Sequence, residues 1–209
     1  HPLYIGSIDT EKMYKTVNNW YWGNFGSPNI YHDPETRKNA MNFRINLTRL
    51  AEQLVEEGKM DKAKNVVDLA MKNFPIDKYG NYFTVEPFAD LYYTLGENKK
   101  AADIATKLFT KAEEDLNFYK GMKLNEQQEF ASDIIFAFET AYRIIDNCEM
   151  HKDTATVTAL NKRIAPFEKY FNRYLNAYKQ QQQSEAEMMQ KEEQMLQDST
   201  AQTIDSTKQ

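Results

Sequence analysis

Residues 46–75 carry the pattern of two antiparallel helices joined by a tight turn. Apolar residues, several of them small, recur at helical spacing on one face of each half. They are Leu50, Ala51, Leu54, Ala63, Val67 and Ala70. Gly58 can adopt the left-handed conformation that ends a helix, and Pro75 cannot continue one. Because small side chains let two helices approach closely, the segment predicts a compact helical hairpin.

The same pattern returns at a constant offset of 38 positions. Ala89, Tyr92, Gly96, Ala101, Ala105 and Leu108 match Ala51, Leu54, Gly58, Ala63, Val67 and Ala70 in order. Hairpins that repeat about every 34 residues are typical of tetratricopeptide arrays, so the extra residues are expected between Pro75 and Asn81. The second helix of this hairpin is predicted to run on to Gly121.

A third, more divergent helix pair follows. Asn125 is expected to cap a helix that buries Phe130, Ile134, Phe138, Ala141 and Ile145. Asp153 is expected to cap a last helix, which Pro166 should kink or break. The apolar seam of this helix comprises Val157, Leu160, Ile164, Phe167, Phe171, Tyr174 and Tyr178. The predicted fold is all-α, a tetratricopeptide-like right-handed array of about three helical hairpins with a long C-terminal helix, over residues 34–178.

Two flanking segments complete the predicted organisation. In residues 1–33, Asp9 or Thr10 caps a short helix, and an aromatic loop leads to Asp33, which caps a helix with Pro34 in its first turn. Residues 179–209 form an acidic tail rich in Gln, Met, Ser and Thr, predicted to be helical and then disordered. An alternative interpretation is a helix that pairs with a partner through Met188, Met189, Met195 and Leu196.

Composition and charge exclude several classes of protein. The chain has 209 residues, 41% of them apolar, but no apolar run long enough to span a bilayer, which predicts a soluble fragment. Six acids and two lysines give residues 180–209 a charge of −4, which leaves −1 of the total −5 for the rest. A nearly neutral body without a basic stripe argues against nucleic-acid binding. The start at His1, without a leader, predicts a piece cut from a longer protein.

The residues that usually mark an enzyme are missing from the sequence. It has no phosphate-binding glycine-rich loop, no His-Glu-x-x-His and no Gly-x-Ser-x-Gly. His1, His32 and His151 lack ligand-like neighbours at helical spacing, and the single Cys148 allows no disulfide within the chain. We therefore expect no catalytic residues, no cofactor and no metal.

Four acids mark a candidate partner groove. Glu52, Glu56, Glu86 and Asp90 fall, together with Tyr93, on the faces that line the concave groove of tetratricopeptide arrays. One interpretation is a solvated helix face, and the other is an acidic groove. An acidic groove argues against an acidic C-terminal peptide as ligand and favours a basic or neutral protein or peptide partner.

The aromatic loop 20–28 is the second candidate site. Trp20, Tyr21, Trp22 and Phe25 could stack on sugar rings or lie at a lipid interface, because amphipathic aromatic rings suit both places. The third interpretation, which we favour, is that these rings plug the end of a helical bundle.

Several short motifs resemble those of a known family. They are Trp22–Gly23, Tyr31–Arg37, Met41–Arg44, Arg49–Glu52, Glu57–Lys59, Tyr82–Phe83, Pro87, Tyr92–Tyr93, Gly96–Glu97 and Asp115–Leu116. Over roughly residues 10–120 the chain resembles the soluble C-terminal region of an uncharacterised family of bacterial multi-spanning membrane proteins. The membrane part of that family is similar to protein O-mannosyltransferases.

The resemblance implies that a membrane-embedded region precedes residue 1 and that this domain lies outside the cytoplasm, in the periplasm. It further implies a noncatalytic scaffold that holds polypeptide substrates or partner subunits for a glycosyltransferase-like parent protein. Two alternatives remain open: a glycan-binding module that uses the aromatic loop, and a dimerisation module that uses the seam between Phe167 and Tyr178.

Overall fold

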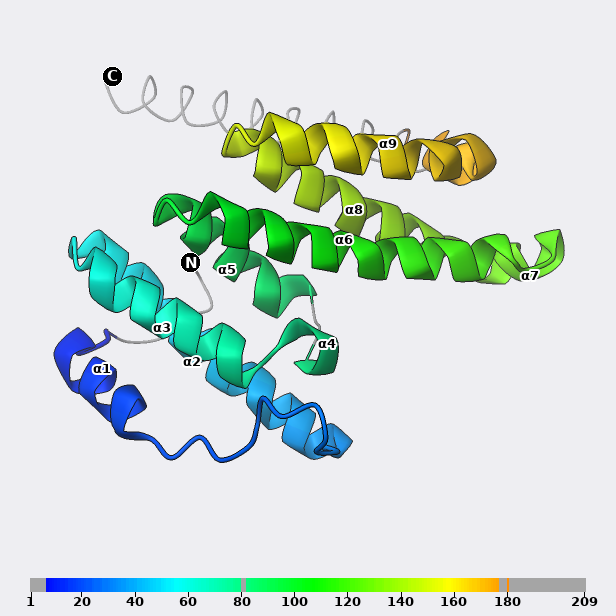
Figure 1. The fold of residues 1–209 in the computed structure, drawn as a ribbon. Helices are drawn as coiled ribbons and strands as arrows, with labels where there is room; N and C mark the ends of the chain where they lie inside the picture. Colours follow the sequence, from blue (N-terminus) through cyan, green and yellow to red (C-terminus); the bar gives the residue numbers. More distant parts are fainter. Residues whose placement is uncertain (1–6, 80–81, 177–179, 181–209) are drawn as a thin grey trace, which may run out of the picture.

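The computed structural model describes residues 7–79, 82–176 and 180 of the chain. Every regular element in these ranges is an α-helix, which confirms the all-α prediction (Figure 1). The helices are α1 (Thr10–Asn19), α2 (Pro34–Glu56), α3 (Met60–Asn73), α4 (Ile76–Tyr79), α5 (Tyr82–Thr94), α6 (Asn98–Lys120), α7 (Leu124–Glu129), α8 (Ala131–Met150) and α9 (Thr154–Tyr170). In the part of the chain so described, no helix is both long and apolar enough to cross a membrane.

Three helical hairpins stack in chain order. They consist of α2 with α3, α5 with α6, and α8 with α9. The second hairpin packs against the first, and the third packs against the second. Figure 1 shows the second helix of each hairpin, α3, α6 and α9, in front of the first helices, α2, α5 and α8. The molecule therefore has two helical layers, with the apolar core between them.

The three hairpins turn through the same hydrogen bond. The amides of Lys59, Glu97 and Asp153 each donate to the carbonyl five residues earlier, at 2.8, 2.8 and 3.0 Å. This bond defines the Schellman motif, whose penultimate residue is left-handed. That residue is Gly58 (φ 73°), Gly96 (φ 75°) or Lys152 (φ 59°). The third turn thus repeats the first two, although a lysine occupies the glycine position.

The matched positions of the first two hairpins all lie where the repeat predicts. Apart from the two turn glycines, all ten residues are buried: Ala51, Leu54, Ala63, Val67, Ala70, Ala89, Tyr92, Ala101, Ala105 and Leu108. The extra residues before Asn81 include α4, which lies between the first hairpin and the second. The 38 positions of the offset therefore include one short helix between the two hairpins.

The start of the third hairpin differs from the prediction. Asn125 does not cap the helix: it lies inside α7, which begins at Leu124, and the carboxylate of Glu126 accepts from the amide of Lys123 at 2.9 Å. The chain leaves helical geometry at Phe130 (φ −101°, ψ 22°) and α8 begins one residue later. The apolar spacing predicted one helix, whereas the structure divides it in two.

The last helix is also divided at a place other than the predicted one. Pro166 does not break α9, which runs to Tyr170, and helical residues resume from 172 to 176. The proline is exposed, which leaves its ring room on the solvent side. Phe167, Phe171 and Tyr174 are buried, as the seam predicted. Tyr178 and the tail residues Met188, Met189, Met195 and Leu196 lie outside the described residues.

A buried arginine joins the first hairpin to the second. Arg44 in α2 is fully buried and donates to the carbonyls of Phe74 at 2.8 Å and Tyr79 at 2.6 Å, and to the hydroxyl of Thr84 at 3.0 Å. The two carbonyls end α3 and α4, where helices lack internal donors and carry partial negative charge. Burial lowers the pKa of Arg44 to about 10, so the guanidinium stays charged at neutral pH.

Candidate functional site

The packing of α5 beside α2 brings acids of the two helices together. Partial burial raises the pKa of Glu52, and the nearby carboxylates of Asp90 and Glu56 raise it further. A raised carboxyl pKa is the expected result of crowded like charge, because each ionised group disfavours the next. Residues that are far apart in sequence therefore form one acidic surface, which we call the acidic face: Glu52, Glu56, Glu86 and Asp90.

Helix α8 adds basic groups to the edge of the acidic face. Arg143 approaches the carboxylate of Glu86 to 3.7 Å, and the Nε2 atom of His151 lies 2.6 Å from Oδ1 of Asp90. Neither contact followed from the sequence, because the third hairpin does not share the offset of the first two. Arg143 thus offsets part of the negative charge of the acidic face at Glu86, and on the α2 side Arg49 acts on Glu52, whose pKa it lowers.

Tyr93, the fifth predicted groove residue, is held inside the chain. Its side chain is buried, and its hydroxyl donates to Oδ2 of Asp153 at 2.8 Å, close to the Sγ atom of Cys148. Its ring stacks on the imidazole of His151 with centroids 4.6 Å apart. Burial raises the pKa of Tyr93, so the phenol stays protonated. Tyr93 therefore packs its ring against the imidazole of His151, and its hydroxyl is hydrogen-bonded within the protein and does not face a groove.

The aromatic loop divides into packed and exposed rings. Trp22 and Phe25 meet Phe74 edge to face, with centroids 5.7 and 5.8 Å away, and the indole of Trp22 donates to the carbonyl of Val17. Trp20 is 38% exposed and Tyr21 is 97% exposed. The loop therefore packs against the first hairpin through two of its predicted recognition residues and presents the other two to solvent.

A glycine allows this loop to lie flat on α3. A Cβ atom at Gly26 would stand 2.3 Å from the carbonyl oxygen of Lys72, a distance that no side chain tolerates. The ammonium of Lys78 donates to the carbonyls of Ser27 and Ile30, in the latter case at 2.7 Å. The end of the loop is thus fastened to α3 and α4 by backbone contact and by one lysine.

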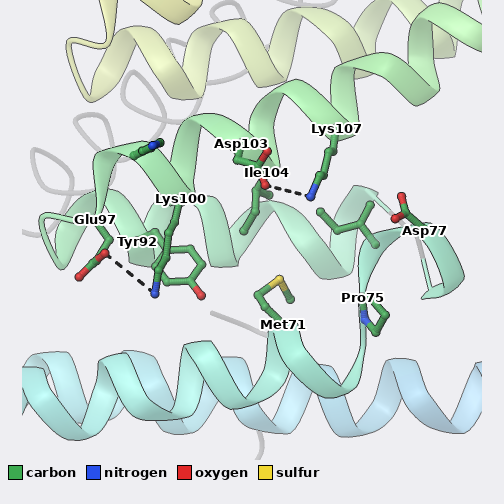
Figure 2. Close-up of a pocket in the computed structure, with 11 residues that line it drawn as sticks. Met71, Pro75, Asp77, Tyr92, Glu97, Lys100, Asp103, Ile104 and Lys107 are labelled. Atoms are coloured by element: carbon green, nitrogen blue, oxygen red, sulfur yellow. Dashed lines mark ion pairs between the residues drawn. The ribbon is translucent and has the colours of Figure 1, made fainter. Parts of the chain in front are cut away.

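A cleft of about 550 Å³ opens between α3, α4 and α6 (Figure 2). Its apolar lining comes from Met71, Pro75, Ile76, Tyr92 and Ile104, and its charged lining from Asp77, Glu97, Lys99, Lys100, Asp103 and Lys107. The volume falls in the range of small-molecule and peptide pockets. The sequence does not predict this cleft, because the residues that form α4 can be recognised in the sequence only as extra residues between the two hairpins.

Two observations concern possible metal binding and thiol chemistry. Within the described ranges, no three His, Cys, Asp or Glu side chains are grouped so that they could hold a metal ion. Cys148 is fully buried, and burial raises the pKa of its thiol, which disfavours the reactive thiolate.

Comparison of the chain with protein-family models, with curated proteins and with solved structures finds no match. Its function is therefore inferred from its own residues and geometry.

Proposed function

We propose that this chain is a noncatalytic, tetratricopeptide-like scaffold that holds a segment of a partner polypeptide. The observation that carries the proposal is the recurrence of one hairpin unit, closed by the same Schellman bond at Lys59, Glu97 and Asp153. Stacked hairpins of this kind form extended surfaces and commonly act by binding. A right-handed superhelix would follow from the same unit.

The acidic face is the proposed binding surface. It is contributed by α2 and α5, the first helices of two successive hairpins, so a bound segment would cross from one hairpin to the next. Repulsion around Glu52 would be relieved by a ligand with lysine or arginine side chains. We therefore propose a basic segment as the partner, with Arg143 and His151 limiting it on the α8 side.

The place of this domain in a larger protein is also a proposal. The motifs between residues 10 and 120 support an extracytoplasmic accessory domain of a glycosyltransferase-like membrane protein. In that setting the acidic face would hold polypeptide substrates or partner subunits near the membrane part, since binding far from a reacting centre can position an acceptor.

Charge reversal on the acidic face tests this function. The wild-type chain and the double variant Glu52→Lys with Glu56→Lys would each capture proteins from membranes of the native host, read by mass spectrometry. We expect captured proteins with basic segments to be lost from the variant. The matched control is Glu114→Lys with Glu129→Lys, which makes the same charge change at two exposed acids of α6 and α7. Equal capture by the wild type and the acidic-face variant would reject the proposal.

A second candidate function rests on the exposed rings of the aromatic loop. Trp20 meets Phe43 edge to face at 5.6 Å and keeps part of its ring in solvent, next to the almost fully exposed Tyr21. Such a pair could stack on a sugar. Titration with oligosaccharides should then change the tryptophan fluorescence of the wild type but not of Trp20→Ala. Dimerisation through the Phe167 seam has less support, because Phe167, Phe171 and Tyr174 are buried in their own chain.

A further inference from the structure

Helices α6 and α8 form a groove on the side of α6 that α9 does not cover. On the other side of α6, Arg163 of α9 donates to Thr110 and Glu113. The groove contains a hollow of about 180 Å³, and both helices line it: Leu108, Lys111, Ala112 and Asp115 from α6, and Phe136, Ala137 and Thr140 from α8. Small-molecule pockets usually have roughly 300–1,000 Å³, so this hollow suits a single side chain of a partner.

Three aromatic rings lie where α6 and α8 adjoin α7. The ring of Tyr119 contacts those of Phe118 and Phe130, with centroids 5.5 and 5.8 Å away. Phe118 is 64% exposed, and Phe136 in the lining of the hollow is 50% exposed. The face of an aromatic ring carries partial negative charge and attracts cations. This end of the groove therefore favours a cationic occupant over a purely apolar one.

Two carboxylates adjoin these rings. Asp115 lies one turn before Tyr119 on α6 and lines the hollow, and Asp133 lies in the first turn of α8. Burial raises the pKa of Tyr119, and the carboxylates of Asp133 and Asp115 raise it further, so both acids lie near the phenol. Within the described ranges, Lys111 is paired with Glu114 at 3.3 Å, whereas neither Asp115 nor Asp133 takes part in an ion pair. The groove therefore offers two carboxylates to a cation from outside.

A guanidinium group fits this combination better than other organic cations. Its planar group stacks on aromatic faces and donates several hydrogen bonds to carboxylates. A lysine ammonium is a compact and strongly hydrated charge. A quaternary ammonium also binds to aromatic faces, but it has no hydrogen to donate to Asp115 or Asp133. The rings and the carboxylates together therefore indicate an arginine side chain.

We propose that the groove between α6 and α8 binds an arginine side chain of a partner polypeptide. The guanidinium stacks on Phe118 and donates to Asp115 and Asp133, and the aliphatic stem of the arginine contacts Phe136. This groove lies on α6 and α8, whereas the acidic face lies on α2 and α5. The inference therefore does not depend on the function proposed above.

Titration of the full-length chain with short peptides, followed by NMR, tests this inference. The probe is acetyl-Ala-Arg-Ala-amide, and the comparison peptides carry lysine or citrulline in place of arginine. Citrulline keeps the planar end of arginine without its charge. We expect the arginine peptide to shift the amide signals of residues 115–119 and 130–137, the lysine peptide to bind more weakly, and the citrulline peptide to cause no saturable shift. Absence of shifts at these residues, or equal binding of the arginine and citrulline peptides, would overturn the proposal.

Removal of the two carboxylates gives a second measurement. Asp115→Asn with Asp133→Asn should weaken binding of the arginine peptide about three- to tenfold, as expected for two exposed ion pairs. The matched control is Asp146→Asn with Glu149→Gln, which removes two exposed acids from the other end of α8 and should leave binding unchanged.

Removal of one ring tests the stacking. Phe118→Ala should weaken binding of the arginine peptide about two- to fivefold, as expected for an exposed cation–π contact. Leu124→Ala, at an apolar residue of α7 that is 61% exposed, is the matched control and should change nothing. Glu52→Lys with Glu56→Lys should keep the shifts at the groove, which separates this inference from the function of the acidic face. Unchanged binding in either groove variant would overturn the proposal.

Discussion

The first and third hairpins reach the same turn from different residues. In the first, Gly58 supplies the left-handed conformation, and Lys59 begins α3 without a side-chain cap. In the third, Lys152 is left-handed in spite of its Cβ atom, and the carboxylate of Asp153 accepts from the amide and the hydroxyl of Thr156. Glycine is therefore not required to close this hairpin. A residue with a side chain can adopt the left-handed conformation, and in the third hairpin the residue that follows it is a capping aspartate.

The two hairpins are also held differently at their other contacts. The first depends on Arg44, whose guanidinium satisfies carbonyls at the ends of α3 and α4. The third depends on Asp153, which accepts the Tyr93 hydroxyl of α5 at 2.8 Å as well as capping α9. In each hairpin one charged side chain connects it to the adjacent repeat, so the comparison can be tested at these two residues.

The largest expected effect is at the first hairpin. Arg44→Met should lower the free energy of unfolding by about 3–5 kcal/mol, because buried carbonyls of Phe74 and Tyr79 lose their donors. Urea unfolding followed by circular dichroism measures this loss. Lys38→Met, at an exposed position of the same helix, is the control and should stay within about 0.5 kcal/mol of the wild type. A comparably small effect of Arg44→Met would show that the guanidinium is dispensable.

The next effect concerns the cap of the third hairpin. Asp153→Ala should cost about 1–2 kcal/mol at neutral pH, since α9 loses its N-cap and Tyr93 loses an acceptor. Lys59→Ala, at the corresponding position of the first hairpin, removes no side-chain cap and should cost less. Thermal unfolding of both variants measures the contrast, and equal losses would remove the distinction between the two hairpins.

Acid should weaken the third hairpin through the same residue. Burial opposes ionisation of Asp153, but hydrogen bonds from Thr156 and Tyr93 outweigh it and hold the pKa of this carboxyl below its usual value. A carboxyl with a lowered folded pKa stabilises the fold above its unfolded pKa of about 3.9, and this contribution is lost as pH falls through the folded value. The stability difference between wild type and Asp153→Asn should therefore shrink as the pH falls from about 5 through the folded pKa of this carboxyl, which lies below its usual value. If this stability difference does not change with pH, the stabilisation by Asp153 comes from the geometry of its side chain and not from its ionisation.

A smaller loss is expected at the turn glycines. Gly58→Ala and Gly96→Ala should each cost about 1 kcal/mol, because both residues have positive φ while a Cβ atom would meet nothing within 4 Å. The cost would thus come from backbone conformation alone. Gly121→Ala is the matched control, since its φ of −73° is open to any residue. Urea unfolding of the three variants compares them directly, and an equal cost at Gly121 would contradict this explanation.

The smallest effect has the opposite sign. Lys152→Gly should raise the free energy of unfolding by about 0.5–1 kcal/mol, because glycine adopts a φ near 59° without the strain of a side chain. Lys123→Gly, at a residue with φ −68°, should bring no such gain. If Lys152→Gly is neutral or destabilising, contacts of the lysine stem must offset the strain of the turn.

The sequence by itself determined most of the local architecture. The helical periodicity and the offset of 38 positions identified the first two hairpins, and the capping roles of Asp33 and Asp153 followed from residue type and position. These features depend on hydrogen bonds and contacts within a few residues, so a short stretch of sequence is enough to predict them. The same reasoning failed at Asn125, and the break that was one of the two outcomes predicted at Pro166 does not occur there. The helix breaks lie at Phe130 and Phe171 instead.

Only the tertiary structure decided which side chains meet across the hairpins. Arg44 stands in an otherwise ordinary helical pattern, yet it contacts residues 30 and 35 positions away. Arg143 and His151 reach Glu86 and Asp90 because α8 packs beside α5, and the cleft exists because α4 separates α3 from α6. Such contacts depend on how whole helices pack, and a periodic pattern shows which face of a helix is buried but not which partner it meets.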